Sequence, residues 1–132
     1  MKYWLFPCNP KQYDLQGAFD SFDKVEWHQH VKNIKIGDLV FIYVGKPFSA
    51  LKLVCEVIDV NIPKQNRSDK DKVYIKDSGL NQKIKLSNSV LLKKMKWIDV
   101  GLEELKSNGL VGNVQGQRSF DGKLLDYLIK KV

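Results

Sequence analysis

The chain has 132 residues, of which 43% are hydrophobic and 28% are charged, and its formal net charge is +7. This length and composition predict a single globular domain over residues 1–132 with a conventional hydrophobic core, and they exclude a fibrous or disordered chain. The longest apolar runs are too short to cross a membrane, and residues 1–8 lack the features of a signal peptide, so we expect a cytoplasmic protein.

The positive charge is concentrated in one part of the sequence. Residues 60–98 contain ten Lys or Arg and three Asp, whereas the segments before and after them are balanced. Such a one-sided basic surface is typical of proteins that bind a polyanion, although lysines also solubilise loops and protect sheet edges from pairing. We predict contacts to a nucleic-acid backbone from Lys64, Arg67, Lys70, Lys93, Lys94 and Lys96.

The first part of the chain predicts a strand and a short helix. Residues 2–8 are aromatic on both alternating faces, which is typical of a buried strand. Asp14 is a good N-cap, and the apolar residues between positions 15 and 22 fall on one face of a helix. Residues 25–32 have no clear period, so a loop or a short helical turn is expected there.

The segment 34–43 has the strongest strand pattern in the chain. Its Gly37-Asp38 turn leads into a nearly unbroken run of apolar, β-branched and aromatic residues, which is typical of a strand covered on both faces. We expect it to be the central strand. It should form an antiparallel hairpin with a strand at 51–60, through a loop of roughly five to seven residues.

The second half of the chain predicts shorter elements. Residues 61–72 are polar and rich in lysine, so a mobile loop is expected there. The other predicted elements are a strand at 73–75, a turn at 78–79, a half-exposed strand at 83–86, a helix at 102–107, a Gly-rich loop at 111–120 and a last helix that begins after Asp121.

No residues form a recognisable metal-binding or catalytic set. Cys8 and Cys55 lie in apolar segments, where a free thiol behaves as a small hydrophobic side chain. His28 and His30 have no cysteine nearby, so we predict no metal site and no cofactor. A Cys–His or carboxylate site is the alternative, but no nucleophile elbow, zincin motif or paired carboxylate spacing accompanies these residues. We therefore expect a binding protein and not an enzyme.

Four aromatic residues are candidates for the wall of a pocket. Trp4, Trp27, Tyr43 and Trp97 are far apart in the sequence, but each lies in or beside an expected strand, so they can converge in a small barrel. Flat rings suit a nucleobase, because stacking contributes roughly 1–3 kcal/mol per base, although aromatic residues also fill the cores of small β proteins. We predict ligand contacts from Trp27, Tyr43 and Trp97. His28 either helps to position the ligand or lies on a solvated loop.

The polar segment at 115–119 is a second candidate for ligand binding. The side chains of Gln117, Arg118 and Ser119 can donate hydrogen bonds to phosphate oxygens or read the edge of a base. The alternative is a plain surface loop. The segment is not a P-loop, because it lacks the Gly-Lys-Ser/Thr ending.

Taken in order along the chain, these patterns resemble the EVE domain of the PUA-like superfamily, which is related to YTH and PUA domains. The resemblance is carried by residues 3–10 (Tyr-Trp-Leu-Phe-Pro-Cys-Asn-Pro), by Trp27, by the strand at 36–43, by residues 55–58 and by residues 115–120. It implies an α+β fold, namely a PUA-like mixed, partly closed β-barrel with flanking helices. The chain departs from the familiar pattern after the second long strand, where the sequence reads Ile-Pro-Lys-Gln.

The resemblance also implies a function. EVE domains are expected to recognise a modified base that is flipped out of DNA or RNA into an aromatic pocket, often as the reading part of a restriction or RNA-modification system. Trp27 and Tyr43 would be pocket walls, and Asn9 would be a polar contact at the end of the first strand. Gln117, Arg118 and Ser119 would contact the base edge or the backbone. The alternatives are a small enzyme that acts on nucleotides or nucleic acid, and a basic module that binds an acidic protein.

Overall fold

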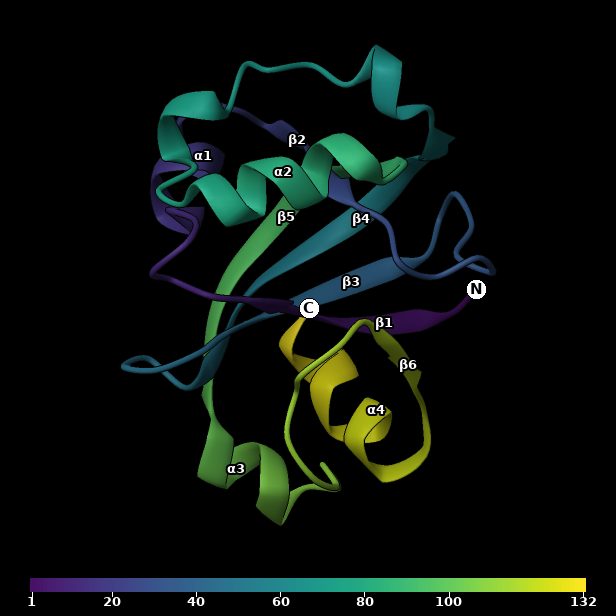
Figure 1. Cartoon of the computed structure of the whole chain (residues 1–132). Coiled ribbons are helices and arrows are strands. Elements are labelled where there is room, and N and C mark those ends of the chain that lie inside the picture. Colours follow the sequence, from purple (N-terminus) through teal and green to yellow (C-terminus); the bar gives the residue numbers. More distant parts are fainter.

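The computed structural model describes all 132 residues, which form one curved mixed sheet with helices on both of its faces (Figure 1). The strands are β1 (Tyr3–Cys8), β2 (Lys24–His28), β3 (Leu39–Val44), β4 (Ala50–Ile62), β5 (Ser89–Gly101) and β6 (Arg118–Phe120). The α-helices are α1 (Leu15–Ser21), α2 (Ser78–Leu86), α3 (Leu102–Ser107) and α4 (Gly122–Leu128). None of the helices is long and apolar enough to span a membrane.

The order of the strands in the sheet is β2-β5-β4-β3-β1-β6. The pair β1–β3 is parallel and the other neighbouring pairs are antiparallel. As predicted, β3 is a central strand, and its six residues are all buried. The predicted hairpin is also confirmed, since residues 45–49 connect β3 to β4.

The turn before β3 is held by the carboxylate of Asp38, which is only 2% exposed. Its oxygens accept hydrogen bonds from the backbone N–H of Lys2, from Trp4 Nε1 and from the backbone N–H of Lys35, each at 2.9 Å. Gly37 has a φ of +95°, a conformation that favours glycine. The Gly37-Asp38 turn therefore fixes the start of β1 against the start of β3.

Each face of the sheet has its own hydrophobic core. One core contains the buried residues of α1 and α2, including Phe19, Leu80 and Ile84. The other core contains Leu105 of α3 and Leu124 and Leu128 of α4. Figure 1 shows this division, with α1 and α2 on one side of the strands and α3 and α4 on the other. Cys8 and Cys55 are buried, as expected for core thiols.

The predictions for β1, α1 and α3 are confirmed, and the side chain of Asp14 caps α1 by accepting from the Gly17 N–H at 3.0 Å. The prediction for residues 25–32 is wrong, because residues 24–28 form strand β2. Val25 and Trp27 point into the core on one face, and the strand pairs with β5. This two-residue alternation is too short to stand out in the sequence, and long-range pairing decides the conformation.

The predictions between residues 73 and 86 are also wrong. Residues 72–74 form a single 3-10 turn, and residues 78–86 form α2 in place of a turn and a strand. The side chain of Asp77 caps α2 by accepting from the Gly79 N–H at 3.1 Å, and Leu80 and Ile84 are buried one turn apart. The apolar spacing of four residues outweighs the short alternation at 83–86.

The sheet is not closed into a barrel, because β2 and β6 are edge strands that do not pair with each other. The structure therefore supports the α+β part of the prediction, and the partly closed barrel only loosely. One side chain links the two edges. Gln117, which precedes β6, accepts from the His30 N–H and donates to the His28 carbonyl oxygen, both at 2.8 Å.

Candidate ligand-binding site

Four of the eight predicted ligand contacts line one cavity beside Trp27, which we call the Trp27 cavity: Asn9, Trp27, His28 and Gln117. Its volume is about 260 Å³. It is smaller than the roughly 300–1,000 Å³ of sites for drug-sized ligands, and this size suits one flat ring system. Its lining comes from five separate segments: Pro7, Cys8, Asn9, Gln12 and Tyr13; Glu26, Trp27, His28 and His30; Arg67 and Asp71; Leu80, Lys83 and Ile84; and Gln115, Gly116 and Gln117.

Four aromatic rings around the Trp27 cavity contact one another in succession. The ring of Tyr13 meets that of Trp27 edge to face, with centroids 5.2 Å apart. The rings of Trp27 and His28 are closer to parallel, at 5.9 Å, and His30 lies 4.7 Å from His28. Trp27 is 5% exposed, and its Nε1 is buried without an acceptor. A buried donor without a partner costs about 1–3 kcal/mol, so a ligand acceptor at this atom would be favourable.

Arg67 is part of the cavity wall. Its side chain is 5% exposed, and Nη2 lies 3.2 Å from a carboxylate oxygen of Asp71, whose side chain is 3% exposed. Nη1 donates to the backbone carbonyl of Glu26 at 3.0 Å, and the Tyr13 hydroxyl donates to Asp71 at 2.8 Å. The burial of Tyr13 and the negative charge of Asp71 raise the pKa of the phenol. The predicted phosphate contact for Arg67 is therefore corrected, because the guanidinium is committed to this network.

The imidazole of His28 is neutral over the physiological pH range. Burial, together with the positive charges of His30, Arg67 and Lys83, lowers its pKa to about 4. A neutral ring beside Trp27 can stack on a ligand, and it can donate or accept a hydrogen bond at either nitrogen. The part of the cavity nearest His28 therefore combines a neutral aromatic wall with cationic side chains.

Asn9 and Gln117 line the cavity as predicted, but both side chains already make internal hydrogen bonds. The Asn9 side-chain oxygen accepts from the Lys11 N–H at 3.0 Å, which shapes the turn after β1. Both ends of the Gln117 amide are bound to the backbone of residues 28 and 30. In this structure Gln117 holds the rim of the cavity and the two edges of the sheet together, and its amide is not free to read a base.

We expect Gln117→Ala to loosen the rim of the Trp27 cavity. The substitution leaves the His30 N–H and the His28 carbonyl without their partner, and should lower the free energy of unfolding by about 1 kcal/mol. Amide hydrogen exchange at His30 should become faster. Gln115→Ala is the matched control, because Gln115 lines the same cavity without a hydrogen bond to the opposite edge. Equal exchange rates in the two variants would contradict the proposed link.

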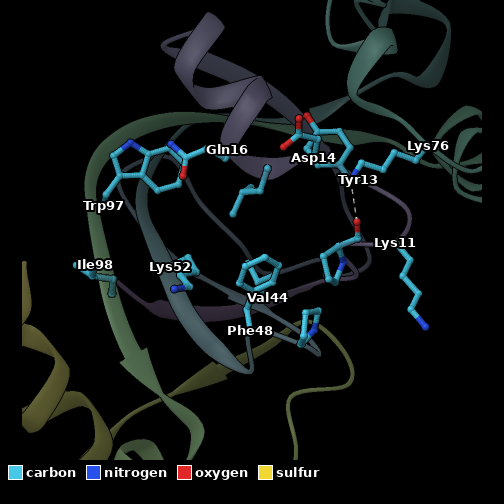
Figure 2. Close-up of a pocket in the computed structure, with 13 residues that line it drawn as sticks. Lys11, Tyr13, Asp14, Gln16, Val44, Phe48, Lys52, Lys76, Trp97 and Ile98 are labelled. Carbon is cyan, nitrogen blue, oxygen red and sulfur yellow. Dashed lines mark hydrogen bonds between the residues drawn. The ribbon is translucent and has the colours of Figure 1, made fainter.

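Trp97 lies in a different cavity, which we call the Trp97 cavity (Figure 2). Its volume is about 460 Å³. It lies between the start of α1, the loop between β3 and β4, and the middle of β5. Tyr13 lines both cavities, and the segment 9–13 separates them. The prediction that Trp97 and Trp27 share one pocket is therefore wrong.

The other predicted contacts are not at the Trp27 cavity. Tyr43 is 8% exposed, belongs to the core beneath α3 and α4, and lines a third cavity with Lys46 and Val114. Arg118 and Ser119 are exposed in β6, where they pair with Leu5 and Trp4. One guanidinium nitrogen of Arg118 donates to the Val111 carbonyl at 3.2 Å. Arg118 and Ser119 therefore lie outside the lining of the Trp27 cavity, although the preceding Gln117 belongs to it.

The side chains predicted to contact a nucleic-acid backbone differ in whether their charged groups are exposed or bound within the protein. Lys64, Lys93 and Lys96 are exposed and form no ion pair. Lys70 is exposed and lies 4.9 Å from the centroid of the Phe22 ring. Lys94 is directed inward, where its Nζ donates to the Phe19 carbonyl at the end of α1 at 2.8 Å. The prediction for Lys94 is therefore corrected to a structural role.

The sequence predictions missed Tyr13, Asp71 and the side of the cavity formed by α2. Leu80, Lys83 and Ile84 line the cavity only because residues 78–86 are helical. The N-cap at Asp77 and the apolar spacing could have indicated this helix. Nothing in the sequence marked Tyr13, whose ring contacts Trp27 and whose hydroxyl donates to Asp71, 58 positions away. No cluster of three or more His, Cys, Asp or Glu side chains is placed to bind a metal ion.

Solved structures with very different sequences have the same fold. ASCH from Zymomonas mobilis matches with a TM-score of 0.70 at 10% identity, over 98% of this chain and 94% of that chain. A protein from Pseudomonas putida has a TM-score of 0.63 at 14% identity, over 97% of each chain. A protein from Rhodopseudomonas palustris has a TM-score of 0.54 at 17% identity, over 98% of this chain and 79% of that chain. These identities are low, so the matches support the fold alone.

No curated protein matches the sequence. The model of one family does match, and it is the EVE domain, over residues 2–119. That range contains all six strands except the last residue of β6, and it contains every residue of the Trp27 cavity. Because the match covers most of the chain, the protein belongs to the EVE domain family.

Proposed function

We propose that this protein binds nucleic acid by taking a single base, extruded from its strand, into the Trp27 cavity. The observation that carries this proposal is the cavity itself, which combines a volume of about 260 Å³ with a wall of four aromatic rings. Extrusion of a base costs a few kcal/mol, and stacking on an aromatic side chain returns roughly 1–3 kcal/mol per base. The unpaired Nε1 of Trp27 supplies a further donor.

The charge around the cavity supports a polyanionic ligand. Residues 60–98 carry the excess positive charge, and five residues of this segment line the cavity, among them the exposed Lys83. The exposed lysines at positions 64, 70, 72 and 85 belong to the same segment. Phosphate groups that flank the extruded base would approach these cations, so binding should weaken steeply as the salt concentration rises.

We favour a reader of bases over an enzyme because the carboxylates in the cavity are occupied. Asp71 accepts hydrogen bonds from Tyr13 and Arg67, and Glu26 accepts from the Ser68 N–H at 3.0 Å. Both carboxylates are already hydrogen-bonded within the protein, which favours a structural role for them over that of a general acid or base. Membership of the EVE family, with the base recognition that the resemblance implies, supports a modified base as the ligand.

The test is a binding titration with fluorescently labelled DNA and RNA oligonucleotides that carry unmodified or methylated bases. Trp27→Ala removes the largest ring and should weaken binding about tenfold or more. Because Trp27 is part of the core, this variant also loses stability, so a second variant blocks the cavity without removing a core residue. A Cβ on Gly116 would meet no atom within 4 Å, so Gly116→Phe adds bulk at the cavity without a clash at the backbone.

Gly101→Phe is the matched control, because its Cβ also meets no atom within 4 Å and Gly101 lines neither cavity. The proposal predicts that Gly116→Phe binds at least about tenfold more weakly than wild type and that Gly101→Phe does not. If folded Gly116→Phe bound every oligonucleotide as wild type does, the Trp27 cavity would not be the site of base binding.

A further inference from the structure

The Trp97 cavity is larger than the Trp27 cavity, and the proposed base-reading mechanism does not use it. Figure 2 shows that its two ends differ in character, with Trp97 and Ile98 at one end, Lys11 and Lys76 at the other, and Phe48 between them. Phe48 is 55% exposed, so a large aromatic ring faces solvent at the edge of this cavity. Exposed apolar surface that lines a concave site is typical of a binding surface.

The charges around the Trp97 cavity favour an anion. Lys11 and Lys76 are exposed and form no ion pair, and Lys76 Nζ donates to the Pro10 carbonyl at 3.2 Å. Lys52 lies 5.7 Å from the centroid of the Phe48 ring and pairs with the exposed Asp99. Asp14 is the only carboxylate in the lining, and one of its oxygens caps α1. Two unpaired lysines, Lys11 and Lys76, therefore line the cavity with one carboxylate, which also caps α1.

We infer that the Trp97 cavity binds a second nucleotide of the strand whose extruded base enters the Trp27 cavity. The base would lie against Trp97 and Phe48, and the phosphate would lie near Lys11 and Lys76. A nucleotide fits both ends of the cavity because it joins a flat aromatic ring to an anionic group. The two cavities share Tyr13, so neighbouring nucleotides of one strand can occupy them. This inference rests on the proposed function, because the nucleic-acid strand reaches the Trp97 cavity from a base bound in the Trp27 cavity.

The experiment uses the indole N–H signals of the three tryptophans in ¹H–¹⁵N NMR spectra of the wild-type protein. Trp27→Phe and Trp97→Phe assign the two signals that report on the two cavities. The probes are AMP, adenosine, a single-stranded oligonucleotide of five residues, and an acidic peptide that contains one phenylalanine. The Trp97 signal tests this inference, and the Trp27 signal tests the proposed function independently.

The inference predicts that AMP and the oligonucleotide shift the Trp97 signal, that adenosine does so more weakly, and that the oligonucleotide binds more tightly than AMP because it spans both sites. Replacing both Lys11 and Lys76 with Gln should weaken binding reported by Trp97 about fivefold to tenfold, since two exposed ion pairs are lost. Lys123→Gln is the charge-matched control, because Lys123 is exposed on α4 and lines neither cavity.

Three results would overturn the inference. A Trp97 signal that no nucleotide or oligonucleotide shifts would exclude a nucleotide site, even if the Trp27 signal responds. A shift with the acidic peptide alone would assign the cavity to a protein partner. Oligonucleotide binding no tighter than AMP binding would indicate a free nucleotide as the ligand. If the Trp97 signal responds and the Trp27 signal stays unchanged, the proposed function fails and this cavity remains the nucleotide site.

Discussion

Replacing Asp38 with alanine is expected to lower the free energy of unfolding by about 3–5 kcal/mol, because one buried and two partly buried hydrogen-bond donors lose a charged acceptor together. The three donors are the backbone N–H groups of Lys2 and Lys35 and the Nε1 of Trp4, each 2.9 Å from the carboxylate. The loss should be visible in urea unfolding followed by circular dichroism. Asp126→Ala is the control, because Asp126 is exposed on α4 and should leave stability close to that of wild type.

The contribution of Asp38 should also depend on pH. Burial acts to raise the pKa of this carboxyl, but the three hydrogen bonds outweigh burial and leave the pKa below its ordinary value. Stability from a lowered carboxyl pKa is present above the unfolded-state pKa and is lost as the pH falls through the folded-state pKa. The difference between wild type and Asp38→Ala should therefore be constant above about pH 5 and decrease below about pH 4. A constant difference down to about pH 2 would contradict this account.

Replacing Arg67 with alanine is expected to destabilise the fold by about 3–5 kcal/mol, because it leaves a buried carboxylate without its counter-ion. Asp71 is 2% exposed, and its remaining partner is the Tyr13 hydroxyl at 2.8 Å. Arg118→Ala is the matched control, since Arg118 is an exposed arginine and should change stability by less than about 0.5 kcal/mol. Urea unfolding of both variants gives the comparison.

A double variant separates the ion pair from the packing of Arg67. Replacing Arg67 with Met and Asp71 with Leu together removes both charges, so it should be less destabilising than Arg67→Met alone. If Arg67→Ala were as stable as Arg118→Ala and bound nucleic acid more weakly, Arg67 would be a surface phosphate contact, and the structural role assigned to it would be wrong.

Local patterns predicted the elements whose sequence signal lies within a few neighbouring residues. Strand β3 was recognisable because a strand buried on both faces has an unbroken apolar sequence, and its six residues are all buried. Helix α1 was recognisable because its cap at Asp14 and its apolar face lie within eight positions of each other. Strand β2 and helix α2 were not recognisable. Both are short segments with competing local patterns, and the residues they pack against are distant in the sequence.

The candidate site was predictable in part. Asn9, Trp27, His28 and Gln117 line one cavity as expected. The family resemblance, which suggested three of them but not His28, is confirmed by the match over residues 2–119. The basic segment was also visible in the sequence. The sequence did not show that two of its side chains point inward. Arg67 and Lys94 use their charges on internal partners, which no count of residues can distinguish from exposed cations.

The sequence by itself determined the family, the central strand with its Gly37-Asp38 turn, and the segment that carries the positive charge. Only the tertiary structure decided that Trp27 and Trp97 line separate cavities and that Tyr43 belongs to the opposite core. Tyr43 faces the other core because a side chain on a strand faces one side of the sheet or the other according to register. Trp27 and Trp97 pack against the same core, but Trp27 pairs with Val90, so Trp97 lies further along β5. Register depends on contacts between distant segments, which the local sequence does not contain.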